Sequence, residues 1–112
     1  MNSVNVTAGI IQLLRLHGRP MICTEYMARP RNSTFGTHIP LFYEEDVGCI
    51  NWGLVSGKTQ TIYPWNSPKD APPPKVWFHD ILYPNGTAFD SNEVTLIQEY
   101  AHNPPSQTLI QI

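Results

Sequence analysis

The chain has 112 residues, a net charge of −2 and only 14% charged residues. This length corresponds to one domain spanning residues 1–112. The weak, scattered charge lacks the electrostatic footprint of a protein that binds nucleic acid or a charged membrane. The longest apolar runs are too short to cross a bilayer. Residues 1–8 lack the basic and apolar regions of a signal peptide, so the compartment stays open.

The first predicted elements are a helix and a strand. A helix is expected over residues 8–17, where four positions follow the i, i+3, i+4, i+7 spacing of a buried stripe: Ile10, Leu13, Leu14 and His17. Gly18 should end this helix, because glycine adopts the left-handed cap conformation without steric cost, and Pro20 cannot continue it. Residues 21–26 then read as a strand, and alternation puts three side chains on one face: Met21, Cys23 and Glu25.

A second helix and a second strand follow. Ser33 or Thr34 is a suitable N-cap for the helix, and its buried stripe is predicted to consist of Phe35, Ile39 and Phe42. Pro40 lies inside this pattern, where it should kink the helix or fall in its first turns. Residues 47–53 form the second strand, with one face made of Gly48, Ile50 and Trp52.

The two strands are predicted to end at the same edge of the sheet, which would form the mouth of a site. Strands joined by a helix run parallel, so the strand ending near Glu25 and the strand ending near Trp52 should meet at one edge of the sheet. A carboxylate beside an aromatic platform at this edge is typical of α/β enzymes. If both residues face this mouth, Cys23 and Cys49 point to opposite faces. The pattern then predicts two free, buried thiols rather than a disulfide.

Residues 54–90 show no regular period. They hold most of the prolines and several aromatics, including Trp65 and Trp77, each of which could pack the loop or contact a ligand. Such composition indicates a long, ordered loop with a functional use. Asp90 is the expected N-cap of a last helix, with Glu93 in the capping-box position. The buried face of this helix should hold Val94, Ile97, Tyr100 and Ala101, and Pro104-Pro105 should end it.

The order of elements is that of an α/β protein. Two strands are too few to make an independently stable sheet. Either residues 77–82 and the C-terminal tail add strands, or the chain is a piece of a larger sheet, and the second option explains more. Residues 1–7 and 106–112 fit no element of this scheme.

Four segments carry a resemblance to a known family: residues 19–29 (RPMICTEYMAR), 48–53 (GCINWG), 57–61 (GKTQT) and 77–81 (WFHDI). In this order they resemble the C-terminal end of cellulase-like retaining glycoside hydrolases of clan A, closest to bacterial proteins described as 1,4-β-xylanases or cellulases. The resemblance covers about residues 17–101. It implies a C-terminal fragment of a (β/α)8 TIM barrel, made of helix six, strand seven, helix seven, strand eight, a long loop and helix eight.

The resemblance also implies roles for individual residues. Glu25 would be the catalytic nucleophile, Trp52 would floor the sugar ring nearest the cleaved bond, and Lys58 and Gln60 would bind substrate at the cleft rim. The implied ligand is a β-linked polysaccharide or oligosaccharide of the xylan or cellulose type, hydrolysed with retention and without cofactor or metal. The family's acid/base glutamate follows an asparagine on strand four. This chain holds only Asn92-Glu93 at a helix start, so we expect it to be inactive alone.

Alternative interpretations remain for these residues. Glu25 could be a strand-end acid that meets solvent or pairs with Arg29, and Trp52 could be a core aromatic. His79 and Asp80 have no third metal ligand at useful spacing and are interpreted as loop packing. Of the remaining histidines, His38 and His102 are predicted at the surface and His17 at a helix end.

Two other functions compete with the hydrolase hypothesis. The first is a non-catalytic carbohydrate-binding or assembly remnant, which keeps the aromatic cleft rim and lacks the acid. The second is a small α/β structural module whose motifs resemble the family by coincidence. If the chain is a fragment of a larger sheet, its unpaired strand edges invite self-association, and a stable monomer would count against that interpretation.

Overall fold

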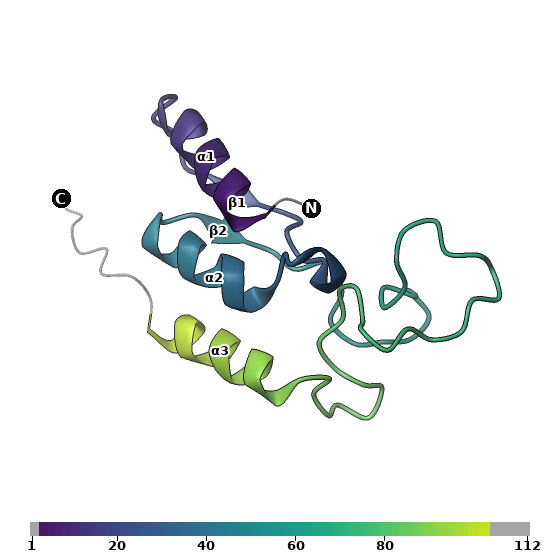
Figure 1. Ribbon diagram of the computed structural model, residues 1–112. Coiled ribbons are helices and arrows are strands. Elements are labelled where there is room, and N and C mark those ends of the chain that lie inside the picture. The colour runs from purple at the N-terminus through teal and green to yellow at the C-terminus, as the bar shows by residue number, and fades with distance from the viewer. Residues whose placement is uncertain (1–2, 104–112) are drawn as a thin grey trace.

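The computed structural model describes residues 3–103 of the chain. Within them three α-helices alternate with two short strands, and a 3-10 turn precedes the second helix (Figure 1). The elements are α1 (Val4–Arg15), β1 (Ile22–Cys23), η1 (Arg29–Arg31), α2 (Phe35–Glu44), β2 (Gly48–Cys49) and α3 (Ser91–His102). This is the predicted order, although each strand has only two residues.

β1 and β2 pair in parallel, as predicted, with Ile22 opposite Gly48 and Cys23 opposite Cys49. Residues opposite each other in a parallel pair project to the same face of the sheet. The two cysteines therefore share a face, and their predicted placement on opposite faces is wrong. Both thiols are free, as predicted. They are not buried, however, because Cys23 is partly exposed and Cys49 is exposed.

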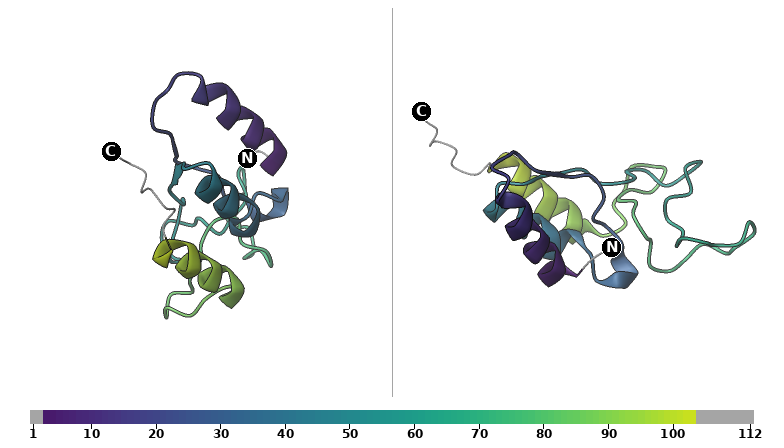
Figure 2. Two further views of the ribbon diagram at one scale, coloured as in Figure 1. Left: turned by 90° about the vertical axis from the view of Figure 1, so that its left-hand side faces the viewer. Right: turned by 90° about the horizontal axis from the view of Figure 1, so that it is seen from above.

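The helices cover one face of this sheet. α2 lies between α1 and α3 and contacts both (Figures 1 and 2). Met21 and Cys23 pack against the core on the helix side. On the other face Ile22 is 67% exposed and Ile50 is 55% exposed. No element of the described residues covers that face, so it presents an apolar surface.

α1 differs most from its prediction. The Ser3 hydroxyl accepts a hydrogen bond from the Val6 N–H at 3.4 Å and caps the helix, which therefore starts before residue 8 and ends at Arg15. Ile11 is its only buried residue. The predicted buried stripe is wrong, because four exposed residues form it: Ile10, Leu13, Leu14 and His17. α1 packs against α2 on one side only, and no other described helix contacts it.

α2 follows its prediction closely. Thr34 is the N-cap, and its side chain and that of Thr37 form a reciprocal capping box. The predicted stripe is confirmed by the burial of Phe35, Ile39 and Phe42, and Pro40 lies inside the helix. His38 was predicted at the surface, but it is 1% exposed and lies 3.0 Å from the Thr7 hydroxyl of α1. It therefore links the two helices.

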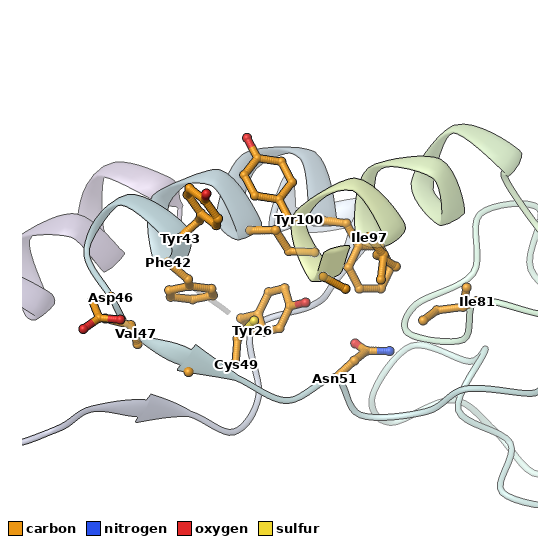
Figure 3. Close-up of a pocket in the computed structure, with 14 residues that line it drawn as sticks. Tyr26, Phe42, Tyr43, Asp46, Val47, Cys49, Asn51, Ile81, Ile97 and Tyr100 are labelled. Carbon is orange, nitrogen blue, oxygen red and sulfur yellow. The ribbon is translucent and has the colours of Figure 1, made fainter. Parts of the chain in front are cut away.

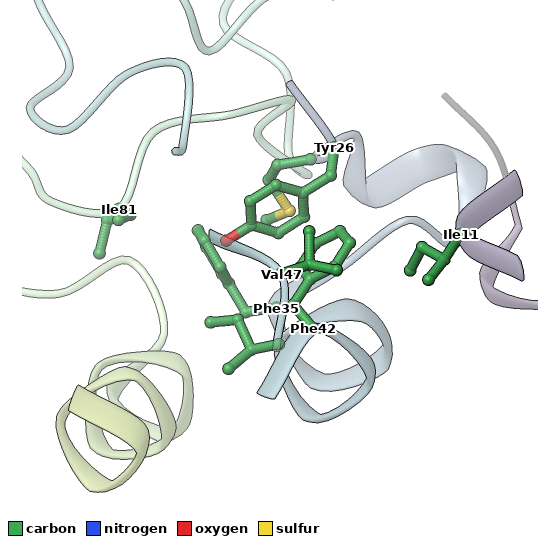
Figure 4. Packing of buried hydrophobic residues seen from close by; sticks show 8 residues of the cluster. Ile11, Tyr26, Phe35, Phe42, Val47 and Ile81 are labelled. Carbon is green, nitrogen blue, oxygen red and sulfur yellow. The ribbon is translucent and has the colours of Figure 1, made fainter. Parts of the chain in front are cut away.

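The core is a cluster of aromatic and aliphatic side chains on the helix side of the sheet (Figure 4). The Tyr26 ring makes edge contacts with Phe35 and Phe42, at centroid distances of 6.0 and 5.2 Å. The other buried members are Ile11, Met27, Ile39, Val47 and Ile81. This cluster fixes the chain immediately after Glu25, because Tyr26 and Met27 are both buried in it.

α3 is held from its first turn. The Asp90 carboxylate accepts a hydrogen bond from the Asn92 N–H at 2.9 Å, which confirms Asp90 as the N-cap. Glu93 does not complete a capping box and binds Arg29 instead. The inner face of α3 is only half-buried, and Ala101, predicted on it, is exposed. Pro104-Pro105 and residues 106–112 lie outside the described residues. None of the described helices has the length and apolar character needed to cross a membrane.

Candidate functional site

Residues 54–90 form a long loop that extends away from one end of the helices (Figure 1). Backbone hydrogen bonds join its two halves. The Phe78 N–H donates to the Ile62 carbonyl at 2.9 Å, and the His79 N–H donates to the Thr61 carbonyl at 3.1 Å. Leu82 forms only isolated bridges, so residues 77–82 do not add a strand to the sheet. The loop nevertheless has a defined path.

A groove of about 660 Å³ lies against this loop. Two exposed indoles line it, with Trp52 52% exposed and Trp65 46% exposed. The rest of its lining is mainly polar and includes Gln60, Tyr63, Asn66, Asp70 and His79. Aromatic faces provide apolar contact area, and hydroxyl, amide and charged groups provide directional hydrogen bonds. This combination suits a ligand with both apolar faces and many hydroxyl groups.

The predicted substrate-binding residues divide between groove and solvent. The structure brings Trp52 and Gln60 together in the groove lining, whereas Lys58 is exposed and does not line it. The two loop tryptophans also differ. Trp65 lines the groove, and Trp77 is 6% exposed with its ring stacked on Phe89 at a centroid distance of 4.6 Å. Trp77 therefore packs the loop.

A buried carboxylate fixes the chain next to Trp52. Asp80 is fully buried, and its two carboxylate oxygens accept from the Thr61 hydroxyl at 2.7 and 2.6 Å. Gly53 has a φ of 106° and passes so close that a Cβ there would overlap Asp80 Oδ1 and the Thr61 side chain. Only glycine fits at this position. The close approach holds the backbone that carries the Trp52 indole at the groove.

His79 lines the groove, and the charge of Glu25 affects its pKa. It is 4% exposed, lines the groove and is hydrogen-bonded to the backbone of Met27. Burial lowers the pKa of His79, while the bond to Met27 and the charges of Asp80 and Glu25 oppose this shift. The charge of Glu25 therefore reaches the imidazole, although its effect is smaller than that of burial. Among the described residues, His79 Nδ1 has no hydrogen-bond partner.

The placement of Glu25 differs from the one that strand alternation predicts. The register puts Cys23 on the face opposite that of Gly48, so alternation would separate Glu25 from Trp52. β1 ends at Cys23, however, and the chain bends at Thr24, so alternation does not extend to Glu25. The side chain is exposed, and its charge acts on His79. The shared-face argument is therefore wrong, and Trp52 lines the polar groove while Glu25 does not.

The alternative partner of Glu25 is engaged elsewhere. The Arg29 guanidinium makes a bidentate ion pair with the Glu93 carboxylate, at 2.8 and 2.7 Å. It also donates to the carbonyls of Trp77 and Asp80. The suggested pairing of Glu25 with Arg29 is therefore wrong, and the carboxylate of Glu25 faces solvent at the edge of β1.

A second groove lies between α2, α3 and β2 (Figure 3) and has a volume of about 500 Å³. Its lining is largely apolar and includes Phe42, Ile97 and Tyr100. Sugar hydroxyls would lose their hydrogen bonds to water there without gaining enough new ones. Trp52 does not line this groove, and Glu25 lines neither of the two grooves. We therefore assign the candidate site to the polar groove that holds Trp52.

The described residues contain no group of three or more His, Cys, Asp or Glu side chains that could hold a metal ion. No family model, curated protein or solved structure matches this chain. The candidate site is thus defined by its own residues: an aromatic, polar groove with a buried histidine whose pKa the charge of Glu25 affects.

His79 should make the fold less stable in acid. Its folded-state pKa is lowered, so below about 6.5 the unfolded chain binds more protons and the free energy of unfolding falls as the pH drops toward the folded-state pKa. Urea unfolding at about pH 7.5 and pH 5.5 measures this loss. We expect His79→Gln to reduce the pH dependence and the exposed control His102→Gln to retain it. Equal pH dependence in both variants would contradict the assignment.

Proposed function

We propose that this chain is the C-terminal part of a retaining glycoside hydrolase that acts on β-linked polysaccharide of the xylan or cellulose type. In this proposal β1 and β2 correspond to strands seven and eight of a (β/α)8 barrel, and α1, α2 and α3 correspond to helices six, seven and eight. One observation carries the proposal. Trp52, Gln60 and His79 line one groove, and Glu25, just beyond the carboxyl end of β1, is near enough for its charge to affect the pKa of His79.

Glu25 is the proposed nucleophile. Its carboxylate would attack the anomeric carbon, the glycosidic C–O bond would break, and the resulting glycosyl ester would be hydrolysed by water. This role requires a carboxylate that a ligand can approach and that no cation neutralises permanently. Glu25 is exposed, and Arg29 is held by Glu93. Both conditions are therefore met by the described residues.

The groove residues would position the sugar. The exposed faces of Trp52 and Trp65 offer stacking surfaces, and aromatic contacts of this kind contribute about 0.5–1.5 kcal/mol beyond their buried area. The Gln60 amide lines the same groove and can both donate and accept hydrogen bonds. Lys58, which lies outside the lining, would meet only a ligand that extends past the groove.

A retaining hydrolase needs a second carboxyl about 5–5.5 Å from the first. Asp80 is tied to Thr61, and Glu93 is tied to Arg29. In this proposal the acid/base is supplied from outside the 112 residues. Loss of an acid/base alone slows such reactions by about 10²–10⁴-fold. The chain by itself should therefore bind the polysaccharide and hydrolyse almost none of it.

Calorimetric titration of the chain with xylohexaose and cellohexaose tests the sugar-binding site. We expect saturable binding of at least one of them, which Trp52→Ala weakens about tenfold because a stacking surface of about 1.4 kcal/mol is lost. Tyr83→Ala, which removes an exposed aromatic side chain outside the groove, should bind like the parent chain. Absence of binding, or equal loss in both variants, would contradict the proposal.

A non-catalytic carbohydrate-binding protein is the second candidate, because the aromatic groove is present while Asp70 is the only described carboxylate in its lining. An activated fluoroglycoside separates the two functions, since its leaving group departs without protonation. The hydrolase proposal expects a covalent glycosyl ester on Glu25, found by peptide mapping and absent from Glu25→Gln. Sugar binding without any label on Glu25 would favour the binding protein.

A further inference from the structure

The two cysteines occupy equivalent positions at the ends of neighbouring strands. Cys23 is the last residue of β1, Cys49 is the last residue of β2, and the two are opposite each other in the parallel register. Both side chains project to the helix side of the sheet, where Cys49 lines the apolar groove (Figure 3). Both thiols are free. The site involves no residue of the candidate sugar groove.

The spacing of the strands brings these residues within bridging range. Neighbouring strands lie about 4.8 Å apart, and the Cα atoms of disulfide-bonded cysteines are usually about 4.4–6.8 Å apart. The Cβ atoms of a disulfide are closer, about 3.8 Å on average. If the two Cα–Cβ bonds run parallel, the Cβ atoms are as far apart as the strands, so forming the disulfide requires them to approach by roughly 1 Å. The strands stay joined at this point, because the Ile50 N–H donates to the Cys23 carbonyl at 2.9 Å, so the approach must come from the side chains and a small shift of the strand ends.

The two thiols differ in access, which sets an order of reaction. Cys49 is exposed, whereas Cys23 is only partly exposed. The Cys49 thiol is hydrogen-bonded to the Tyr26 hydroxyl, and the Cys23 thiol donates to the Glu25 carbonyl at 3.6 Å. A soluble oxidant should therefore meet Cys49 first, with Cys23 directly beside it as the resolving thiol.

We propose that Cys23 and Cys49 are a redox-active pair that oxidised glutathione, or a similar small disulfide, converts into a cross-strand disulfide within the chain. The Cys49 thiolate attacks one glutathione sulfur, the glutathione S–S bond breaks, and one glutathione thiolate leaves. The Cys23 thiolate then attacks the Cys49 sulfur and expels the second glutathione. The two protein thiols are oxidised, one glutathione disulfide is reduced to two thiols, and the protons released by the cysteines end on glutathione.

The geometry makes this bond reversible. Disulfides that depart from relaxed geometry are more easily reduced than structural ones. Oxidation also removes the thiol proton that Cys23 donates to the Glu25 carbonyl. The disulfide therefore changes a contact at the start of the segment that carries Glu25. The inference concerns the thiols alone and stands whether or not the groove binds sugar.

Equilibration of the folded chain with mixtures of reduced and oxidised glutathione tests the proposal. Partial burial raises the pKa of both thiols, so the exchange is followed over hours at mildly alkaline pH, by intact mass and non-reducing peptide maps. The expected product has lost two hydrogen atoms, carries no glutathione and yields a peptide that links Cys23 with Cys49. Cys23→Ser should instead retain glutathione on Cys49, because the resolving thiol is missing.

The same equilibrium in urea supplies the decisive comparison. If the fold aligns the thiols, their effective concentration is expected to be about tenfold or more higher in the folded chain than in the unfolded chain. Circular dichroism confirms that the oxidised and reduced chains stay folded. The proposal is overturned by a lower effective concentration in the folded chain, by stable glutathione adducts on the parent chain, or by disulfides between chains.

Discussion

Replacing Arg29 with Met is expected to destabilise the fold by about 2–4 kcal/mol, because it leaves a partly buried carboxylate and two buried carbonyl groups without their donor. The Arg29 side chain is 6% exposed and that of Glu93 is 14% exposed. The guanidinium also lies over the Phe89 ring, 4.7 Å from its centroid. One side chain thus ties η1, the start of α3 and the second half of the long loop together.

Urea unfolding measures this loss, and Arg31→Met is its matched control. Arg31 lies two residues away on the same 3-10 turn, is exposed, and has its guanidinium 5.2 Å from the centroid of the Trp65 ring. Its replacement should cost about 1 kcal/mol or less. The double variant Arg29→Met, Glu93→Leu should recover part of the stability, since no buried charge is left unpaired. Equal effects of the two single Met variants would show that Arg29 does not connect these segments.

Replacing Gly53 with Ala is expected to cost about 3 kcal/mol and to weaken sugar binding as well. The added Cβ would overlap Asp80 Oδ1 and the Thr61 side chain. Relief of this overlap must displace a fully buried carboxylate from its hydroxyl donor, which costs about 1–3 kcal/mol in addition to backbone strain of about 1–3 kcal/mol. The displaced backbone would also move Trp52 away from the groove.

Gly86→Ala separates the overlap from the backbone strain. Gly86 has a φ of 88°, but a Cβ there would meet no atom within 4 Å. Its replacement should therefore cost only the strain of the positive φ, about 1–2 kcal/mol, and leave sugar binding unchanged. If the two alanine variants lose equal stability in urea, the close approach of Gly53 to Asp80 has no energetic role.

Local signals in the sequence predicted the parts of the fold that depend on local interactions. Thr34 and Asp90 cap helices because their side chains bond backbone N–H groups within the next three residues. The stripe of α2 is buried because that helix has neighbours on several sides. The same reasoning failed for α1, whose apolar residues at Leu13 and Leu14 have the right spacing but no described neighbour to cover them. Periodicity predicts a helix, but burial depends on what packs against it.

The candidate site depends on contacts that sequence patterns do not encode. Trp52 and Gln60 line one groove, and their role in binding substrate stays a prediction. The interpretation of His79 and Asp80 as loop packing is confirmed, because both are buried in the loop. Nothing near His79 in the sequence shows that it would also line the same groove as Trp52. The register of β1 against β2 was also missed, since strands of two residues carry too short a pattern to fix alternation at Glu25.

One measurement tests the central claim most directly: a heteronuclear NMR titration of the chain with cellohexaose or xylohexaose. The account predicts that the indole N–H signals of Trp52 and Trp65 and the backbone N–H signal of Glu25 shift together with one affinity, while the buried indole of Trp77 stays unchanged. Shifts at the indoles without any at Glu25, or no saturable shift in the groove, would contradict the claim that these residues form one sugar-binding site.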